Sequence, residues 1–202
     1  LGGSPRRYPW TMGFQQSYRG EGAIYGRDLV KRRPGARVAV LVENTELGKD
    51  MTRGLSRAIA GKGPRVVASE SYEFTSPDVS SQAPKLEASG ADTLALFVTP
   101  KFMIQAIVAA NKLGWRPQLY IASISIEPGI MAIARTNAPQ LTKGARSIAF
   151  VKNPNDPIWA KDPALALYRA IMKRHYPSGR PSDVYNWYGM TVAWSMVDAL
   201  QR

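Results

Sequence analysis

The feature that most constrains the fold is a short apolar run, rich in β-branched residues, that returns about every 27 residues. The first run covers residues 38–42, and later runs begin near Arg65, Asp92, Leu119 and Ala145. An interval of this length accommodates one strand, one helix and two loops. The runs are apolar nearly throughout, which is typical of parallel strands that are covered on both faces.

The segments between these runs carry apolar residues at helical spacing. Met51, Leu55 and Ile59 recur at every fourth position, and another helix is predicted over residues 20–33. Pro84 lies inside the segment 79–89, where it predicts a kinked or late-starting helix. The alternation predicts an α/β fold, a doubly wound open sheet of about five mainly parallel strands with helices on both faces.

No stretch of the sequence resembles a linker between domains, since the Pro-rich segment 153–157 is short enough to be a loop. We therefore expect a single α/β lobe over residues 1–202. The chain begins with Leu1 and carries no apolar export segment, so we expect it to be a fragment of a larger protein. No apolar run approaches the roughly 20 residues that a membrane-spanning helix needs.

The residue types that build most catalytic and metal sites are scarce. The chain has no Cys and one His, which excludes thiol nucleophiles, zinc–thiolate sites and multi-histidine centres. The start Gly20-Glu21-Gly22 does not continue into a dinucleotide-binding motif, because Tyr25 occupies the position of the third glycine. We therefore predict no catalytic residue, no metal and no cofactor.

An α/β enzyme is one alternative. Glu43 and Glu46 flank the end of the first apolar run and could form an acid–base pair. Loss of turnover rather than of binding on Glu→Gln substitution would identify this function. The simpler interpretation is that one of the two caps the following helix or faces water.

The formal net charge of +12 raises the alternative of an anionic partner, either nucleic acid or an anionic membrane surface. The only dense cluster is Lys31-Arg32-Arg33, at the expected end of a helix, where cations complement the helix dipole. The other basic residues are scattered singly. We therefore predict no nucleic-acid partner.

Hydroxyl side chains follow several of the predicted strands. Open parallel sheets bind ligands beyond the carboxyl ends of their strands. At those ends stand Thr45, Thr99, Ser123 and Ser125. Together with helix N-termini, these hydroxyls are the material of a site for a small polar ligand. Each one alone is equally well explained as a helix cap or a turn former.

Several segments, in order along most of the chain, resemble one known family. Residues 37–41 leading into 47–50 resemble a strand followed by an acidic turn. Residues 89–94 carry Gly-Ala-Asp before a strand, and residues 99–117 contain Thr-Pro and later Leu-Gly-Trp-Arg-Pro. Residues 184–200 resemble a helix with a Tyr and a trailing Ala-Leu pair. The chain is similar to type I periplasmic binding proteins of the branched-chain amino-acid (Leu/Ile/Val) receptor kind.

This resemblance implies an extracytoplasmic receptor with two lobes, located in the periplasm or held at the cell surface as a lipoprotein. Such a receptor closes on an amino acid or a similar small organic solute and delivers it to the membrane permease of an ABC importer. The chain resembles only the second lobe, so the missing first lobe of the same protein is an implied partner. The resemblance also implies a binding protein and not an enzyme.

The candidate ligand-binding residues are Thr45, Leu47, Thr99, Ser123, Ser125 and Tyr185. The resemblance itself points to positions 47, 99 and 123. Leu47 and Thr99 stand where the family commonly has aromatic residues, and the segment 122–125 lacks the acidic group that often meets a ligand ammonium. Amides, aromatic acids and other small organic solutes are therefore open beside Leu, Ile and Val.

The same fold also serves as the ligand-sensing domain of regulators and receptors, and the fold alone does not separate sensing from transport. A DNA-binding or signalling segment fused in the gene would favour the sensor. An export or lipoprotein signal would favour the transport receptor.

Overall fold

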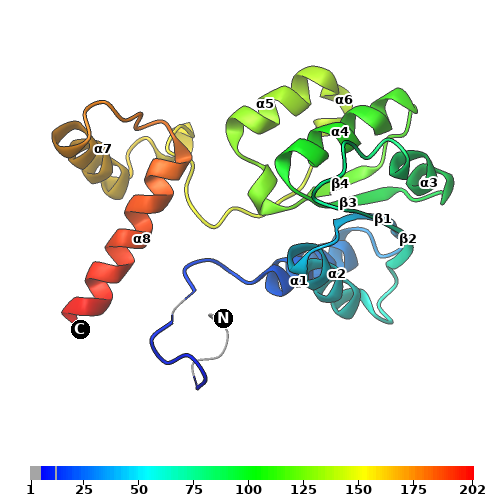
Figure 1. Ribbon diagram of the computed structural model, residues 1–202, viewed down its shortest axis with the longest axis horizontal. Coiled ribbons are helices and arrows are strands. Elements are labelled where there is room, and N and C mark those ends of the chain that lie inside the picture. The colour runs from blue at the N-terminus through cyan, green and yellow to red at the C-terminus, as the bar shows by residue number, and fades with distance from the viewer. Residues whose placement is uncertain (1–5, 12) are drawn as a thin grey trace. The chain divides into compact units, whose positions relative to one another are not determined.

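A computed structural model of the chain describes residues 6–11 and 13–202. The chain divides into two compact units, one formed by residues 16–148 and the other by residues 149–202 with the described part of 1–15. The first unit holds a sheet, whereas the regular elements of the second are helices (Figure 1).

Parallel strands form the sheet of the first unit, in the order β2-β1-β3-β4. They are β1 (Arg37–Glu43), β2 (Arg65–Tyr72), β3 (Thr93–Phe97) and β4 (Gln118–Ile121). The helices of this unit are α1 (Tyr18–Arg32), α2 (Glu46–Ile59), α3 (Gln82–Ala88), α4 (Pro100–Lys112), α5 (Pro128–Asn137) and α6 (Pro139–Thr142), with a short 3₁₀ helix η1 (Ser123–Ser125). The late start of α3, with Pro84 in its first turn, confirms the predicted effect of this proline.

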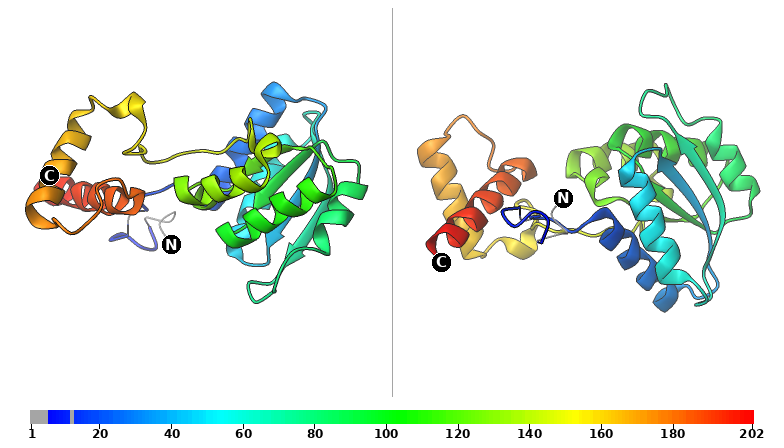
Figure 2. Two further views of the ribbon diagram at one scale, coloured as in Figure 1. Left: turned by 90° about the horizontal axis from the view of Figure 1, so that it is seen from above. Right: turned by 60° about the horizontal axis from the view of Figure 1, so that its bottom comes forward.

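Two apolar cores cover the two faces of the sheet. On one face α1 and α2 pack against Val38 and Val40 of β1. On the other face α3, α4, α5 and α6 pack against Ala39 and Leu41 of the same strand. Successive residues of β1 therefore point to opposite cores, as expected of a strand buried on both faces. This arrangement confirms the predicted doubly wound α/β fold, and the helices on both sides of the sheet can be followed in Figure 2.

The prediction of about five strands is wrong in its last member, because the sheet of the described chain has four. In the segment 145–151, only Arg146 makes an isolated parallel bridge with β4. The carbonyl of Ile121, which a longer ladder would use, instead accepts the hydroxyls of Tyr25 and Ser147, both at 2.7 Å. These side chains therefore end the pairing after one bridge.

Glycines allow α1 and α2 to lie in backbone contact. A Cβ at Gly22 would lie 2.0 Å from the carbonyl oxygen of Met51, and one at Gly54 would lie 2.1 Å from that of Arg19. Any larger side chain would force the helices apart. The close packing fixes the start of α1, including Glu21, relative to the sheet.

The helical unit contains α7 (Pro163–His175), α8 (Val184–Gln201) and a 3₁₀ helix η2 (Pro157–Trp159). An aspartate before each long helix caps it by accepting backbone N–H groups. The core of this unit is small and consists of Leu165, Tyr168, Met172 and Trp187. Among the described helices, none combines the length and the apolar character needed to cross a membrane.

The sheet and the helices that cover it occupy residues 16–148. It stays a prediction that the helical unit folds together with these elements as one lobe over residues 1–202. The expectation that the chain is a fragment of a two-lobed protein also stays a prediction.

Candidate functional site

The strand order creates a topological switch point at the carboxyl ends of the two central strands. From β1 the chain crosses to β2 on one side, and from β3 it crosses to β4 on the other side. The connections therefore diverge between β1 and β3, and open α/β sheets bind ligands at such a switch point. The loops beside it follow Glu43 and Phe97.

The side chain of Glu43 gathers three hydroxyl groups at this switch point. Its Oε2 accepts hydrogen bonds from the hydroxyls of Tyr72 and Thr99, each at 3.0 Å. Its Oε1 accepts a hydrogen bond from Thr45 Oγ1 at 3.2 Å. Because Glu43 is only 5% exposed, these donors replace the water that the carboxylate loses on burial. One buried acceptor thus holds hydroxyls from three strand ends together.

Thr45 and Thr99 precede α2 and α4 as N-cap residues, but neither side chain caps its helix. Both hydroxyls turn to Glu43 instead, so the first turns of the two helices begin beside the switch point without a cap from these side chains. Gly48 allows α2 to begin there, since a Cβ at this position would lie 2.1 Å from the Glu43 carbonyl oxygen.

A second carboxylate, Glu21 of α1, is buried at the end of β4 with 1% exposure. It accepts the backbone N–H of Ser123 at 2.6 Å and the Ser123 hydroxyl at 2.8 Å. The Tyr25 hydroxyl lies 2.7 Å from the same carboxylate and 2.7 Å from the Ile121 carbonyl oxygen, so the two acceptors share its single proton. Burial, followed by the charges of Glu21 and Glu43, raises the pKa of Tyr18, so this phenol lies within the electrostatic reach of both carboxylates.

The arrangement offers hydrogen bonds rather than covalent chemistry. Burial raises the pKa of Tyr72 and that of Tyr25, so both phenols keep their protons and donate at neutral pH. The hydroxyls of Thr45 and Thr99 donate to Glu43 and keep lone pairs that can accept from a ligand. In the part of the chain that the structure describes, no group of three or more His, Cys, Asp or Glu could hold a metal ion.

Two of the candidate residues predicted from the sequence, Thr45 and Thr99, come together through their shared partner Glu43. Leu47 lies in the first turn of α2, where it is half-buried and packs on the core beneath α1 and α2. These three residues lie beside the switch point between β1 and β3.

The other candidate residues have different environments. Ser123 and Ser125 lie in η1 and are buried, at 8% and 0% exposure. The Ser125 hydroxyl donates to the carbonyl oxygen of Val98 at 2.8 Å, so it ties η1 to the end of β3. Tyr185 belongs to the helical unit, where it is exposed at the start of α8.

Sequence reasoning did not identify Tyr18, Glu21 or Tyr72 as part of this cluster, and it treated Glu43 only as a base or a cap. Tyr72 carries a usable signal, because it ends a predicted strand beside the first one. Glu21 carries none, because its partner Ser123 lies 102 residues away along the chain.

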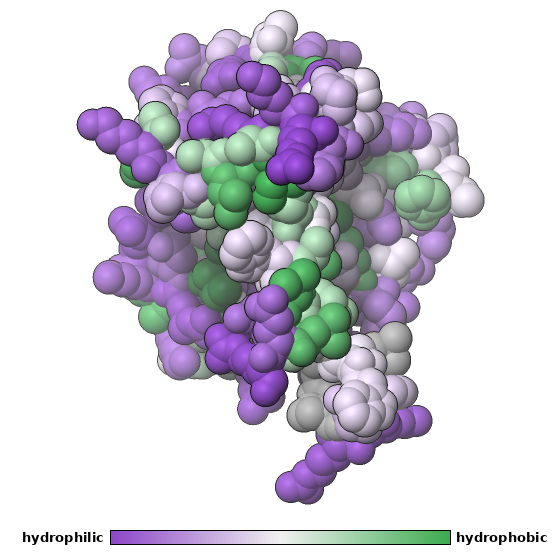
Figure 3. All heavy atoms as spheres, turned by 90° about the vertical axis from the view of Figure 1, so that its left-hand side faces the viewer, coloured by the Kyte–Doolittle hydropathy of each residue, from purple (hydrophilic) through white to green (hydrophobic). Residues whose placement is uncertain are grey.

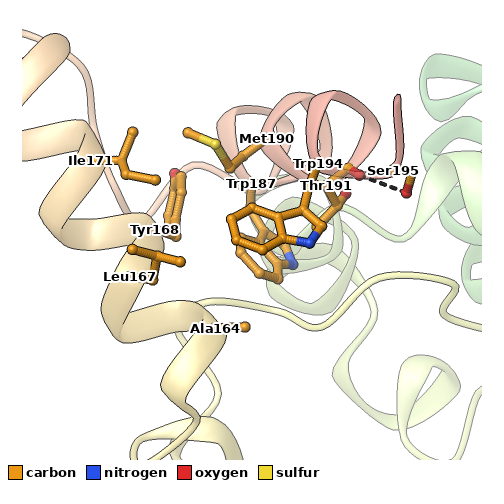
Figure 4. A pocket seen from close by; sticks show the side chains of 9 residues that line it. All are labelled: Ala164, Leu167, Tyr168, Ile171, Trp187, Met190, Thr191, Trp194 and Ser195. Carbon is orange, nitrogen blue, oxygen red and sulfur yellow. Dashed lines mark hydrogen bonds between the residues drawn. The ribbon is translucent and has the colours of Figure 1, made fainter. Parts of the chain in front are cut away.

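The helical unit has a pocket of its own between α7 and α8, with a volume of about 290 Å³. Figure 4 shows its lining, with Leu167 and Ile171 on α7 and the indole rings of Trp187 and Trp194 on α8. The pocket is mainly apolar because most of its lining side chains are aliphatic or aromatic. The hydroxyl of Tyr168 and Nε1 of Trp187 are buried without a hydrogen-bond partner among the described residues.

Apolar side chains of α8 are also exposed beyond this pocket. Trp194, Met196 and Val197 are each more than half exposed, and Leu200 is 79% exposed. Figure 3, which views the molecule from the side of α7 and α8, shows apolar side chains gathered among hydrophilic ones. A group of exposed apolar side chains is typical of a surface that another protein segment covers.

The sequence matches the model of one protein family, described as periplasmic binding protein, over residues 2–202. No curated protein matches the chain.

Among solved structures, the chain resembles an extracellular ligand-binding receptor from Verminephrobacter eiseniae (18% identity, TM-score 0.71), covering 100% of this chain and 56% of that one. It also resembles a fatty acid ABC transporter substrate-binding protein from Thermomonospora curvata (20% identity, TM-score 0.63), covering 80% of this chain and 41% of that one. A third similar structure is a branched-chain amino acid ABC transporter from Thermus thermophilus with bound valine (17% identity, TM-score 0.55), covering 61% of this chain and 32% of that one. At these identities the likeness concerns the fold. The chain spans between 32% and 56% of the length of these proteins.

Proposed function

We propose a function from the premise that this chain belongs to the periplasmic binding protein family, which it matches over residues 2–202. The chain is the solute-binding component of an ABC importer and binds an amino acid or a similar small organic solute outside the cytoplasm, in the periplasm or at the cell surface. Its partners are that solute and the membrane permease of the importer, and it catalyses no reaction. The family match over nearly the whole chain is the observation that carries this proposal.

The solute contacts of the α/β unit are Thr45, Leu47 and Thr99, because these partly exposed side chains lie beside the switch point. Ser123 and Ser125 support the site from behind, since their hydroxyls donate to groups within the unit. Tyr185, exposed at the start of α8, is a separate candidate contact within the helical unit. Hydrogen bonds to hydroxyls and apolar contact with Leu47 would then provide the binding energy.

The site combines the hydroxyls of Thr45 and Thr99 with the apolar side chain of Leu47, so we expect a solute that carries both polar and apolar groups. The two transporter relatives differ in the ligand named for them, a fatty acid for one and bound valine for the other. A fair panel of candidate solutes therefore contains amino acids, their amides, fatty acids and aromatic acids.

A second lobe of the same protein completes the receptor in this proposal. All of this chain aligns with only 56% of the receptor from Verminephrobacter eiseniae, so that receptor has a large part with no counterpart here. The exposed apolar side chains of α8 support a missing neighbour, because a helix with such a surface is normally buried. Closure of the two lobes would trap the solute by a hinge motion.

The experiment is a thermal-shift screen of this panel on the 202-residue chain and on the longer product of its gene. A solute at 100 times its Kd stabilises the folded state by about 2.7 kcal/mol, which raises Tm by roughly 5–10 °C for a protein of this size. Thr99→Val should weaken the binding of a positive solute by about tenfold, since one hydrogen-bonding group is lost. The matched control is Thr136→Val, an exposed threonine whose hydroxyl bonds its own helix. A panel without a shift in either form would contradict the proposal.

A further inference from the structure

The loops that enter the strands form one surface, here called the amino edge (residues 33–37, 60–65, 89–93, 112–118 and 143–146). Contacts join each loop to the next across the end of the sheet. They are Gly63 against the Pro34 carbonyl, Arg37 to the Gly90 carbonyl at 3.0 Å, Trp115 Nε1 to the Ala91 carbonyl at 3.0 Å, and Gln118 to the Gly144 carbonyl at 2.7 Å. The amino edge is therefore continuous.

The amino edge is strongly basic. Its eight basic residues are Arg33, Arg37, Lys62, Arg65, Lys112, Arg116, Lys143 and Arg146, against the single acidic residue Asp92. Asp92 is already in an ion pair with Arg33 at 3.1 Å. Five of the cations are exposed and form no ion pair within the described chain. These five are Lys62, Arg65, Lys112, Arg116 and Lys143.

The opposite end of the sheet, which holds the switch point, has an excess of acidic residues. The loops there (residues 15–21, 43–47, 72–82, 97–101 and 122–128) contain six acidic and two basic residues. The acids are Glu21, Glu43, Glu46, Glu73, Asp78 and Glu127, and the bases are Arg19 and Lys101. The helices run antiparallel to the strands, so cations at their C-termini and acids at their N-termini collect at opposite ends. The α/β unit is therefore electrically polarised along its strands.

We propose that the amino edge binds the anionic phospholipid headgroups of a membrane surface. Its exposed cations are spread across the width of the sheet, which suits a broad and diffuse anionic surface. A single-stranded nucleic acid would instead need aromatic side chains for its bases to stack on. Trp115 is the only aromatic residue of the amino edge, and its ring nitrogen donates to the Ala91 carbonyl.

This inference rests on the proposed function, which puts the chain beside a membrane that holds an importer. A negative surface attracts the amino edge, so it concentrates the chain at the membrane that holds the importer.

The test measures how the 202-residue chain partitions onto phosphatidylcholine vesicles with and without phosphatidylglycerol. The double variant Lys62→Gln/Arg116→Gln removes two exposed cations of the amino edge. Its matched control, Lys49→Gln/Lys101→Gln, removes two exposed cations from outside that edge and has the same net charge. The edge variant should bind phosphatidylglycerol vesicles about 30-fold more weakly, and the control should bind about as well as the unaltered chain. Raising ionic strength from about 0.05 M to about 0.5 M should release the chain.

Equal losses in the two double variants would overturn the proposal, because net charge alone would then explain binding. Equal partition onto pure phosphatidylcholine would also overturn it and would point to the apolar side chains of α8. An oligonucleotide that binds more tightly than phosphatidylglycerol at equal phosphate concentration would assign the amino edge to nucleic acid instead. The solute screen on the same variants separates the two proposals, because neither pair of substitutions includes a proposed solute contact.

Discussion

At the scale of single residues, Glu43 organises more of the candidate site than any other side chain. Three hydroxyls donate to it while it is 5% exposed. Glu43→Gln keeps the shape but replaces an acceptor oxygen with an NH₂ group, so one hydroxyl loses its acceptor. We expect the free energy of unfolding in urea to fall by about 1–3 kcal/mol. Glu46→Gln, at a side chain that is 79% exposed, should change it by less than about 0.5 kcal/mol, and equal effects would contradict this role for Glu43.

Asp28 of α1 links the stability of the α/β unit to pH. Burial raises the pKa of Asp28, but hydrogen bonds from Tyr120 and Arg32 and the charge of Arg146 lower it more, so the net pKa is below its usual value. A carboxyl group with a lower pKa in the folded state stabilises the fold above its unfolded pKa, about 3.9. This contribution is lost as the pH falls through the folded pKa.

Asp28→Asn is therefore expected to lower the urea midpoint at about pH 7, where the charged form contributes fully. The midpoints of the two proteins should converge as the pH falls through the folded-state pKa of Asp28. A difference that stays constant from neutral to acidic pH would show that the substitution acts through packing alone.

The sequence predicted the candidate site only in part, and the residues show why. Thr45 and Thr99 were predicted because each follows a strand, and position along the chain is enough to find such residues. Their common partner Glu43 could not be assigned, since a helix cap and a buried acceptor look alike in sequence. Glu21 was beyond prediction, because only the folded chain brings α1 to the end of β4.

At the scale of elements, the contact between α1 and α2 depends on glycine. Gly22→Ala would put a methyl group 2.0 Å from the Met51 carbonyl oxygen, so the helices must separate. We expect the free energy of unfolding to fall by at least about 1–3 kcal/mol, measured by urea denaturation followed by circular dichroism. Gly189→Ala is the control, because a Cβ there meets nothing within 4 Å and alanine favours a helix. Equal effects of the two substitutions would contradict the glycine interface.

The strands β1, β3 and β4 were predictable because each is an apolar run between turn signals, and β2 was predictable from the shorter run Val66-Val67. The fifth run does not form a strand, since strand pairing also needs free backbone acceptors. The acceptor in question is Ile121 O, which is occupied by side chains from α1 and from Ser147, and no local pattern reveals that competition. Pattern reading therefore finds candidate strands better than it finds where a sheet ends.

At the scale of the whole molecule, no pattern in the sequence indicates that residues 149–202 gather into a separate compact unit. The sequence of the segment 153–157 is typical of an ordinary loop. The sequences of α7 and α8 have the apolar content that is typical of core helices. Within the described chain these helices share only a small core, and several apolar side chains of α8 are exposed, so apolar content alone does not show which residues a helix buries.

The exposed apolar side chains of α8 predict that the 202-residue chain associates with itself. Met196, Val197 and Leu200 are each more than half exposed, and covering them removes apolar area from water at roughly 25 cal/mol per Å². Sedimentation equilibrium should therefore show an apparent mass that rises with concentration. Met196→Gln/Leu200→Gln should suppress this rise, whereas Val66→Gln/Leu113→Gln, at exposed apolar side chains of the α/β unit, should not. A monomer at every concentration would mean that α8 needs no covering partner, and it would remove the main structural support for a second lobe.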